Sequence, residues 1–156
     1  MRVRPLFGLS VLASFIAWGT VAYLYAWPAI TTAPLKAALM ALIAPHMFRF
    51  VGLSFLVPGV VSETLPAAFA APAAWGDLVA ALLAMTATLG LAANAPWAIT
   101  MVWIFNIWGT VDLFNAYTQG LIRLPSGPTA LGAAFYIPTF VVPGLLVSHA
   151  LIFKLL

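Results

Sequence analysis

Long apolar segments are the feature that most restricts how this chain can fold. They cover about residues 6–27, 35–61, 77–94, 97–120 and 130–153. Each is long enough to cross the hydrocarbon core of a bilayer, which takes about 20 helical residues. Because a backbone inside hydrocarbon must satisfy its own hydrogen bonds, such segments form helices. The sequence therefore predicts an all-α integral membrane protein, in which residues 1–156 form a single domain built as a bundle of about five transmembrane helices.

The chain has too few charged residues for a soluble domain beside these helices. Of its 156 residues, 65% are hydrophobic and 6% are charged, whereas soluble domains carry about 25% charged residues. The six basic residues are scattered rather than clustered, so nucleic-acid binding is not indicated. The absence of cysteine excludes disulfides, iron–sulfur clusters and thiolate zinc sites.

The first apolar segment has one property of a signal peptide, because Arg2 and Arg4 precede it. However, the run from Leu6 to Trp27 is longer than the core of a signal peptide, which has about 7 to 15 residues. We therefore expect a retained transmembrane helix. A cytoplasmic amino terminus is favoured because it places more basic residues on that side, Arg2, Arg4 and Arg123 against Lys36 and Lys154.

Prolines interrupt the second and fifth segments. Pro45 and Pro58 lie in the second, and Pro138 and Pro143 lie in the fifth. A proline inside a helix removes a backbone hydrogen bond and clashes with the preceding turn. We therefore expect helices 2 and 5 to be kinked.

The stretch 62–76 is apolar but rich in proline and alanine. We expect it to form an interfacial or re-entrant segment rather than part of a transmembrane helix. Asp77 follows this stretch and is then expected in the first turn of the third helix, where the helix dipole favours an acid.

A polar stripe crosses the fourth segment. At about 100° per residue, Trp108, Asp112, Asn115 and Gln119 lie on one side of a helix, and Asn106 belongs to the same segment. A charged side chain turned toward hydrocarbon costs about 2.5 to 3.5 kcal/mol. The pattern therefore predicts that the stripe faces the interior of the bundle.

Charged residues from three segments are expected to converge in one leaflet, namely Arg49, Asp77 and Asp112. In one interpretation they line a polar cavity, in which Arg49 binds an anion or a lipid headgroup, or a carboxylate exchanges protons. In the other, Arg49 pairs with Asp112 or Asp77 and fixes the helix packing, since unpaired charges are rarely tolerated at such depth.

His46 and His149 are the only histidines, and two histidines can bind a haem iron. Their expected depths differ, because His46 lies near the middle of its segment and His149 near the end of the last one. We therefore favour structural histidines that donate to backbone carbonyls, and we do not expect haem. Trp108 is interpreted as a packing residue rather than as the wall of a ligand site.

No catalytic motif is present. The sequence contains no His-x-x-x-His pair or histidine–acid cluster with the spacing of a metal site, and no serine lies in a Gly-x-Ser-x-Gly elbow. The chain is therefore interpreted as non-catalytic and without a metal.

Four motifs carry a resemblance to a family. They are Arg-x-x-Gly-x-x-Phe-Leu at Arg49–Leu56, Leu-Pro-x-x-Phe-Ala with Pro-Ala-x-x-Gly-Asp at Leu65–Asp77, Asn-x-x-Gly-x-x-Asp-Leu at Asn106–Leu113, and Ile-Pro-Thr-Phe-x-Val-Pro with a later histidine at Ile137–His149. The second motif has one additional residue before its second proline. The chain resembles a family of short, uncharacterised bacterial multi-pass inner-membrane proteins with these motifs.

The resemblance implies a location in the bacterial inner membrane. It also implies that one common design includes Arg49, Asp77, Asn106, Asp112 and His149. His46 stands where the family often has glutamine, which counts further against haem.

Two classes of function fit these observations. The first is a small non-catalytic membrane protein, either an accessory subunit of a larger membrane complex or a binder of a lipid, quinone or pigment. The alternative is a small transporter or channel that uses the Arg49 cluster and works as a homo-oligomer, because five helices are few for alternating access.

Overall fold

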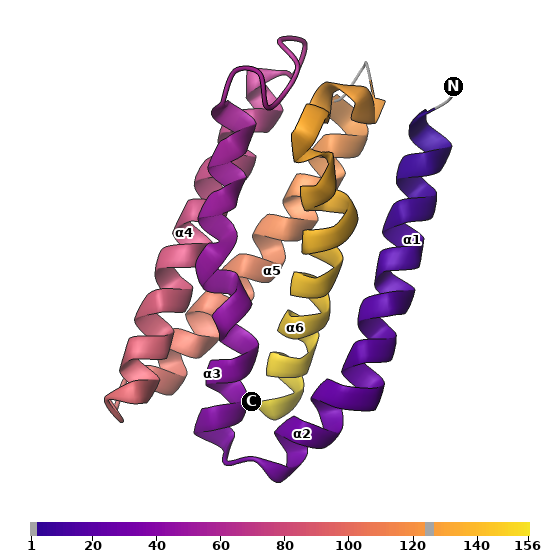
Figure 1. Cartoon of the computed structure of the whole chain (residues 1–156). Helices are drawn as coiled ribbons and strands as arrows, with labels where there is room; N and C mark the ends of the chain where they lie inside the picture. Colours follow the sequence, from indigo (N-terminus) through magenta and orange to yellow (C-terminus); the bar gives the residue numbers. More distant parts are fainter. Residues whose placement is uncertain (1–2, 124–126) are drawn as a thin grey trace.

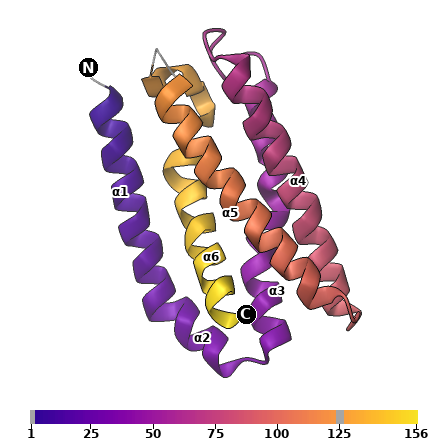
Figure 2. The ribbon, with the colours of Figure 1, turned by 180° about the vertical axis from the view of Figure 1, so that it is seen from behind.

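The computed structural model describes residues 3–123 and 127–156, which fold into a bundle of helices (Figure 1). No strand is present in these two ranges, so the prediction of an all-α chain is confirmed for them. The bundle begins with α1 (Val3–Val21) and finishes with α6 (Val142–Leu155), and the two chain termini lie at opposite ends of it (Figures 1 and 2). Arg2, residues 124–126 of the expected loop and the side chain of Arg123 lie outside the described residues.

The first helical segment is longer than the sequence indicated. α1 continues into the π-helical turn η1 (Ala22–Ala26) and then into α2 (Trp27–Thr32). The expected end at residue 27 is therefore wrong. Pro28 does not end the helix, because it stands at the start of α2 directly after the π-helical turn, where a missing N–H group disturbs little.

The second segment changes its helix type at a proline. α3 (Leu35–Ile43) is followed directly by the 3-10 helix η2 (Ala44–Leu56), which has Pro45 in its first turn. Proline cannot donate to the carbonyl four residues earlier, and the tighter 3-10 pattern begins at this point. The segment ends at Leu56 rather than at residue 61, since Pro58 and Gly59 (φ 83°) leave the helix.

The third segment begins well before its expected start. α4 (Ala67–Ala92) is continuous and contains Pro72. The expected interfacial or re-entrant stretch is therefore wrong from Ala67 onward, and Asp77 lies inside a helix rather than in its first turn. Alanine has the highest helix propensity, and a proline near the amino-terminal end of a helix disturbs few hydrogen bonds. The alanines of this stretch therefore outweigh its prolines.

The fourth and fifth segments follow the predicted order. α5 (Ala98–Arg123) forms the expected hairpin with α4, after a turn in which Asn94 has a φ of 53°. The last segment consists of η3 (Gly127–Phe135), η4 (Ile137–Val141) and α6. Its prolines lie where the helix is irregular or begins anew, Pro138 in the π-helical η4 and Pro143 in the first turn of α6.

Small residues on α4 bring the central helices close together. Ala80, Ala81, Ala84 and Ala87 are fully buried, and the last two belong to a core cluster with large apolar residues of α3 and α5. In contrast, α1 lies at the edge of the bundle and packs on η3, η4 and α6 (Figure 2).

Four helical segments of the described chain are long and apolar enough to cross a membrane, namely Val3–Thr32, Leu35–Leu56, Ala67–Ala92 and Ile137–Leu155. α5 has 26 residues, as many as α4, but its polar residues lower its hydropathy. The coarse prediction of a helical protein with several helices of membrane-spanning type is therefore confirmed.

Candidate functional site

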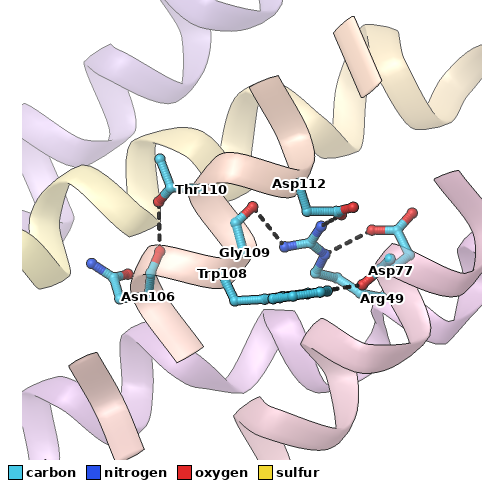
Figure 3. Close-up of polar contacts among 8 residues, drawn as sticks. Arg49, Asp77, Asn106, Trp108, Gly109, Thr110 and Asp112 are labelled. Atoms are coloured by element: carbon cyan, nitrogen blue, oxygen red, sulfur yellow. Dashed lines mark hydrogen bonds and ion pairs between the residues drawn. The ribbon is translucent and has the colours of Figure 1, made fainter. Parts of the chain in front are cut away.

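Arg49, on η2, donates hydrogen bonds to two other helices (Figure 3). Its Nε donates to Oδ1 of Asp77 on α4 at 2.7 Å, and its Nη2 donates to Oδ2 of Asp112 on α5 at 2.6 Å. Its Nη1 donates to the carbonyl oxygen of Gly109 at 3.2 Å. Each guanidinium nitrogen thus has an acceptor, although Arg49 is only 3% exposed.

The cluster contains both of the acids that the sequence offered as alternatives. Asp77 and Asp112 each form an ion pair with Arg49. Buried charges depend on one another, because a charge removed from water needs a compensating charge and hydrogen bonds nearby. When all three groups are ionised, the two carboxylates exceed the one guanidinium by one negative charge. Loss of the Arg49 guanidinium should therefore destabilise the cluster more than loss of either carboxylate.

Two glycines make room for the carboxylates. A Cβ atom on Gly52 of η2 would overlap the carboxylate of Asp77, and a Cβ atom on Gly76 of α4 would overlap the carboxylate of Asp112. Both glycines belong to motifs that the sequence displays, but nothing in the sequence says which side chain each one accommodates. They allow the three helices to close around the charges.

Asn106 and His149 form a second buried polar pair, between α5 and α6. Nδ1 of His149 lies 2.6 Å from Oδ1 of Asn106, and Nδ2 of Asn106 donates to the carbonyl oxygen of His149 at 3.3 Å. This orientation makes Oδ1 the acceptor, so Nδ1 of the imidazole carries the proton. A Cβ atom on Gly109 would lie 2.6 Å from the His149 ring and 2.9 Å from Nη1 of Arg49. Only a residue without a side chain therefore fits between the two polar groups.

His46 and His149 lie side by side, contrary to expectation. Their ring centroids are 4.2 Å apart. The predicted difference in depth is wrong because α6 packs on α3 in a register in which the hydroxyl of Ser148 donates to the carbonyl oxygen of Leu42 at 2.7 Å, and this places His149 beside His46. A haem held by both imidazoles would have to lie between the rings, and their contact leaves no space for it.

The expected hydrogen bonds from the histidines to backbone carbonyls are also not formed. His149 uses its Nδ1 for the Asn106 side chain. Within the described residues, both nitrogens of His46 and Nε2 of His149 are buried without a hydrogen-bond partner. His46 instead packs against aromatic rings, with its centroid 5.0 Å from that of Phe105. Among residues 3–123 and 127–156, no group of three or more histidine or acidic residues could hold a metal ion.

The polar stripe on α5 is only partly buried. Asn106 is buried and Asp112 is half-buried, whereas Trp108 and Asn115 are exposed. Gln119 is half-buried and donates to Oδ1 of Asn115 at 3.4 Å. The predicted interior position is therefore wrong for Trp108 and Asn115. An apolar row defines the interior face of α5 instead, namely Ala98, Val102, Phe105 and Leu113.

A cavity of about 640 Å³ lies between α1 and the rest of the bundle. Most of the side chains that line the cavity are aromatic or aliphatic. The charged residues among them are Asp77 and Arg4, which lies near the start of α1. The volume is within the range of ligand-binding pockets, about 300 to 1,000 Å³. This cavity was not predicted from the sequence. The one available signal was the spacing of Phe7, Val11 and Phe15, which places three apolar side chains on one face of α1.

Comparison with known families places the chain in one of them. Residues 6–156 match the family model described as Domain of unknown function (DUF8737), and the chain belongs to this family. No curated protein and no solved structure matches the chain. The matched region includes both the Arg49 cluster and most of the residues that line the cavity.

Proposed function

We propose that this member of the DUF8737 family is a non-catalytic multi-pass membrane protein that binds an apolar molecule of the membrane, such as a lipid, quinone or pigment, beside α1. The observation that carries the proposal is the cavity of about 640 Å³. Preformed pockets with mainly apolar walls and a few polar groups are typical of small-molecule sites.

The Arg49 cluster has a structural role in this proposal. Arg49 already donates to two carboxylates and a carbonyl oxygen, so the guanidinium is not held ready for an anion. This arrangement weakens the alternative of a small oligomeric transporter or channel, for which an incoming ion needs a site with groups still to be satisfied. The role of an accessory subunit remains compatible with the proposal, because a bound lipid can lie at the border with a larger partner.

The proposed location is the bacterial inner membrane, with five helical crossings and a cytoplasmic amino terminus. Support comes from the long apolar helices and from the chain termini at opposite ends of the bundle (Figure 1). Single cysteines at Arg4 and Lys154 should react with an impermeant label from opposite sides of the membrane. Reaction of both from the same side would contradict an odd number of crossings.

Ligand binding can be tested by filling the cavity. Gly8 lines the cavity, and nothing lies within 4 Å of a Cβ atom placed on it, so Gly8→Leu is chosen to add apolar volume there. Gly19 has equally open surroundings on the same helix but does not line the cavity. Gly19→Leu is therefore the matched control.

The measurement is native mass spectrometry of protein purified in mild detergent. We expect a bound small molecule in the wild type and in Gly19→Leu, and its loss in Gly8→Leu. Equal occupancy in all three proteins would contradict binding in this cavity. The same spectra report a stoichiometric larger partner or a homo-oligomer, the two assemblies that fit this chain.

A further inference from the structure

α5 carries a polar side chain on its outer surface at a depth where hydrocarbon would surround it. In the proposed topology this helix crosses the membrane, and its 26 residues are about 39 Å long, against about 30 Å for the hydrocarbon core. Asn115 lies eight residues before the end of α5 at Arg123, which is about 12 Å along the helix. It is therefore expected within the hydrocarbon, and yet it is exposed.

The carboxamide of Asn115 is not satisfied by the chain itself. Nε2 of Gln119 donates to its Oδ1 at 3.4 Å, which is long for a hydrogen bond. Within residues 3–123 and 127–156, Nδ2 of Asn115 has no acceptor. Thr20 on α1 and Thr86 on α4 are also exposed, but each hydroxyl donates to a carbonyl oxygen of its own helix. Because an amide without partners is costly in hydrocarbon, Asn115 needs a partner outside this copy of the chain.

The residues around Asn115 are spaced like those between two paired helices. Five exposed residues recur at alternating intervals of four and three, and we call them the α5 seam: Ile104, Trp108, Val111, Asn115 and Thr118. This spacing keeps the side chains in one line when two helices cross at about 20°, the commonest arrangement in membranes. A single asparagine in such a seam specifies the register and the number of helices. In Figure 2, α5 crosses in front of α6 and no other helix covers it.

We propose that two copies of this chain pair through the α5 seam, with the two Asn115 side chains hydrogen-bonded to each other. Copies of a membrane protein insert in the same orientation, so a two-fold axis along the membrane normal places each residue at the depth of its own counterpart. A carboxamide has both donors and an acceptor and is therefore complementary to itself. None of the five seam residues is charged, so no like charges meet. This inference rests on the proposed crossing of the membrane by α5.

Disulfide formation can detect this contact, because the chain contains no cysteine of its own. Val111→Cys places a thiol in the seam, and Ile16→Cys places one on α1, where the exposed fraction is 63% against 62% at Val111. Each protein is reconstituted in vesicles of phosphatidylcholine and phosphatidylglycerol and oxidised. The covalent dimer should be the main product for Val111→Cys and a minor one for Ile16→Cys, since only paired helices hold two thiols within bonding distance. Equal yields would show random collision and overturn the proposal.

Variants of Asn115 test its role in the pairing. Copies labelled at Glu63→Cys, an exposed loop position, report pairing by energy transfer as lipid is added to dilute the protein. Asn115→Ala should raise the dissociation constant about threefold to thirtyfold, the effect of a hydrogen bond between membrane helices. Asn115→Gln keeps the carboxamide and should retain most of the pairing. Thr86→Ala, an exposed polar-to-alanine change on α4, is the matched control and should behave as the wild type.

The outcomes separate this proposal from the proposed function. Pairing that Asn115→Ala leaves unchanged overturns the proposal, and so does the absence of energy transfer, which would mean that the seam faces lipid or a different protein. At dilutions that keep the chain monomeric, Asn115→Ala should unfold like the wild type, so weaker pairing is not a folding defect. Failure of pairing leaves the cavity test with Gly8→Leu unaffected. Reaction of cysteines at Arg4 and Lys154 from one side would instead contradict the proposed topology itself.

Discussion

The two sides of the bundle are built differently. Around Arg49, the helices η2, α4 and α5 pack so closely that a Cβ atom on Gly52 or Gly76 would overlap a carboxylate. On α1 the same test finds open space at Gly8 and Gly19, where nothing lies within 4 Å of an added Cβ atom, whereas α6 contacts α1 closely at Gly144, whose Cβ atom would overlap the Trp18 ring. We call the first the closed side and the second the open side, which contains the cavity.

This difference separates the contacts that connect the helices from the cavity in which we propose that a ligand binds. On the closed side, polar groups satisfy one another across three helices, and glycine allows the helices to approach. On the open side, aromatic residues of α1 pack on η3 and η4, as in the pairs Phe7–Phe135 and Trp18–Phe140, and a cavity of about 640 Å³ remains. The charged residues that stand out in the sequence therefore connect the helices, and the cavity proposed to bind a ligand is lined mainly by common apolar residues.

The largest effect is expected from Arg49→Leu, which leaves Asp77 and Asp112 buried without a cation. Loss of one partner of a buried ion pair costs about 3 to 5 kcal/mol, and two uncompensated carboxylates should place this variant at the upper end. Asp77→Leu or Asp112→Leu leaves one acid against one base, so each should cost less. The measurement is the free energy of unfolding in mild detergent on titration with a denaturing detergent.

The triple variant Arg49→Leu, Asp77→Leu, Asp112→Leu is the control for this cluster. Its stability should be far closer to the wild type than the sum of the three single costs, because no buried charge remains. Additive costs would show that the closed side does not depend on mutual neutralisation.

A smaller effect is expected from Gly76→Ala. The added methyl group displaces the carboxylate of Asp112 from Arg49, and overpacking of this kind costs about 1 to 3 kcal/mol. Gly19→Ala, on the open side, should be neutral or stabilising because alanine is the better helix former. The same unfolding titration applies, and equal effects at the two positions would remove the distinction between the sides.

Replacing the buried asparagine of α5, Asn106, should destabilise the protein more than replacing the exposed one, Asn115. Asn106→Ala leaves Nδ1 of His149 without its partner at 2.6 Å, and an unsatisfied buried donor costs about 1 to 3 kcal/mol. Asn115 is exposed, so Asn115→Ala should change the unfolding free energy by no more than about 0.5 kcal/mol. A comparable loss at both positions would restore the view that the whole polar stripe faces inward.

The smallest effect is expected on the open side, from Trp18→Phe. The indole nitrogen of Trp18 donates to the carbonyl oxygen of Phe140 at 3.0 Å, and one such bond contributes about 0.5 to 1.5 kcal/mol. The loss should loosen α1 without affecting the Arg49 cluster. Hydrogen exchange should therefore increase over α1 and η4 and stay unchanged over α4; an increase throughout the bundle would show that α1 is part of the same cooperative unit.

The sequence was sufficient to predict that Arg49 forms an ion pair with an acid from another segment, Asp77 or Asp112. In a chain with so few charges, each buried one must find a partner among the others. The start of α4 was misplaced because an alanine-rich stretch with prolines can be either a helix or a loop, and the end of the second segment was misplaced because Pro58 and Gly59 leave the helix although the residues around them are apolar. The contact of His46 with His149 was missed for a related reason, since relative depth depends on where each helix actually begins and ends.

By itself, the sequence determined that this chain is helical and that Arg49 must be neutralised, because apolar length and the cost of a buried charge act on any fold the chain adopts. Only the tertiary structure decided that Asp77 and Asp112 share Arg49, that Gly52, Gly76 and Gly109 make room for the polar groups, and that a cavity opens beside α1. These features depend on the distance between helices, which is set by how small and large side chains from distant segments pack against one another.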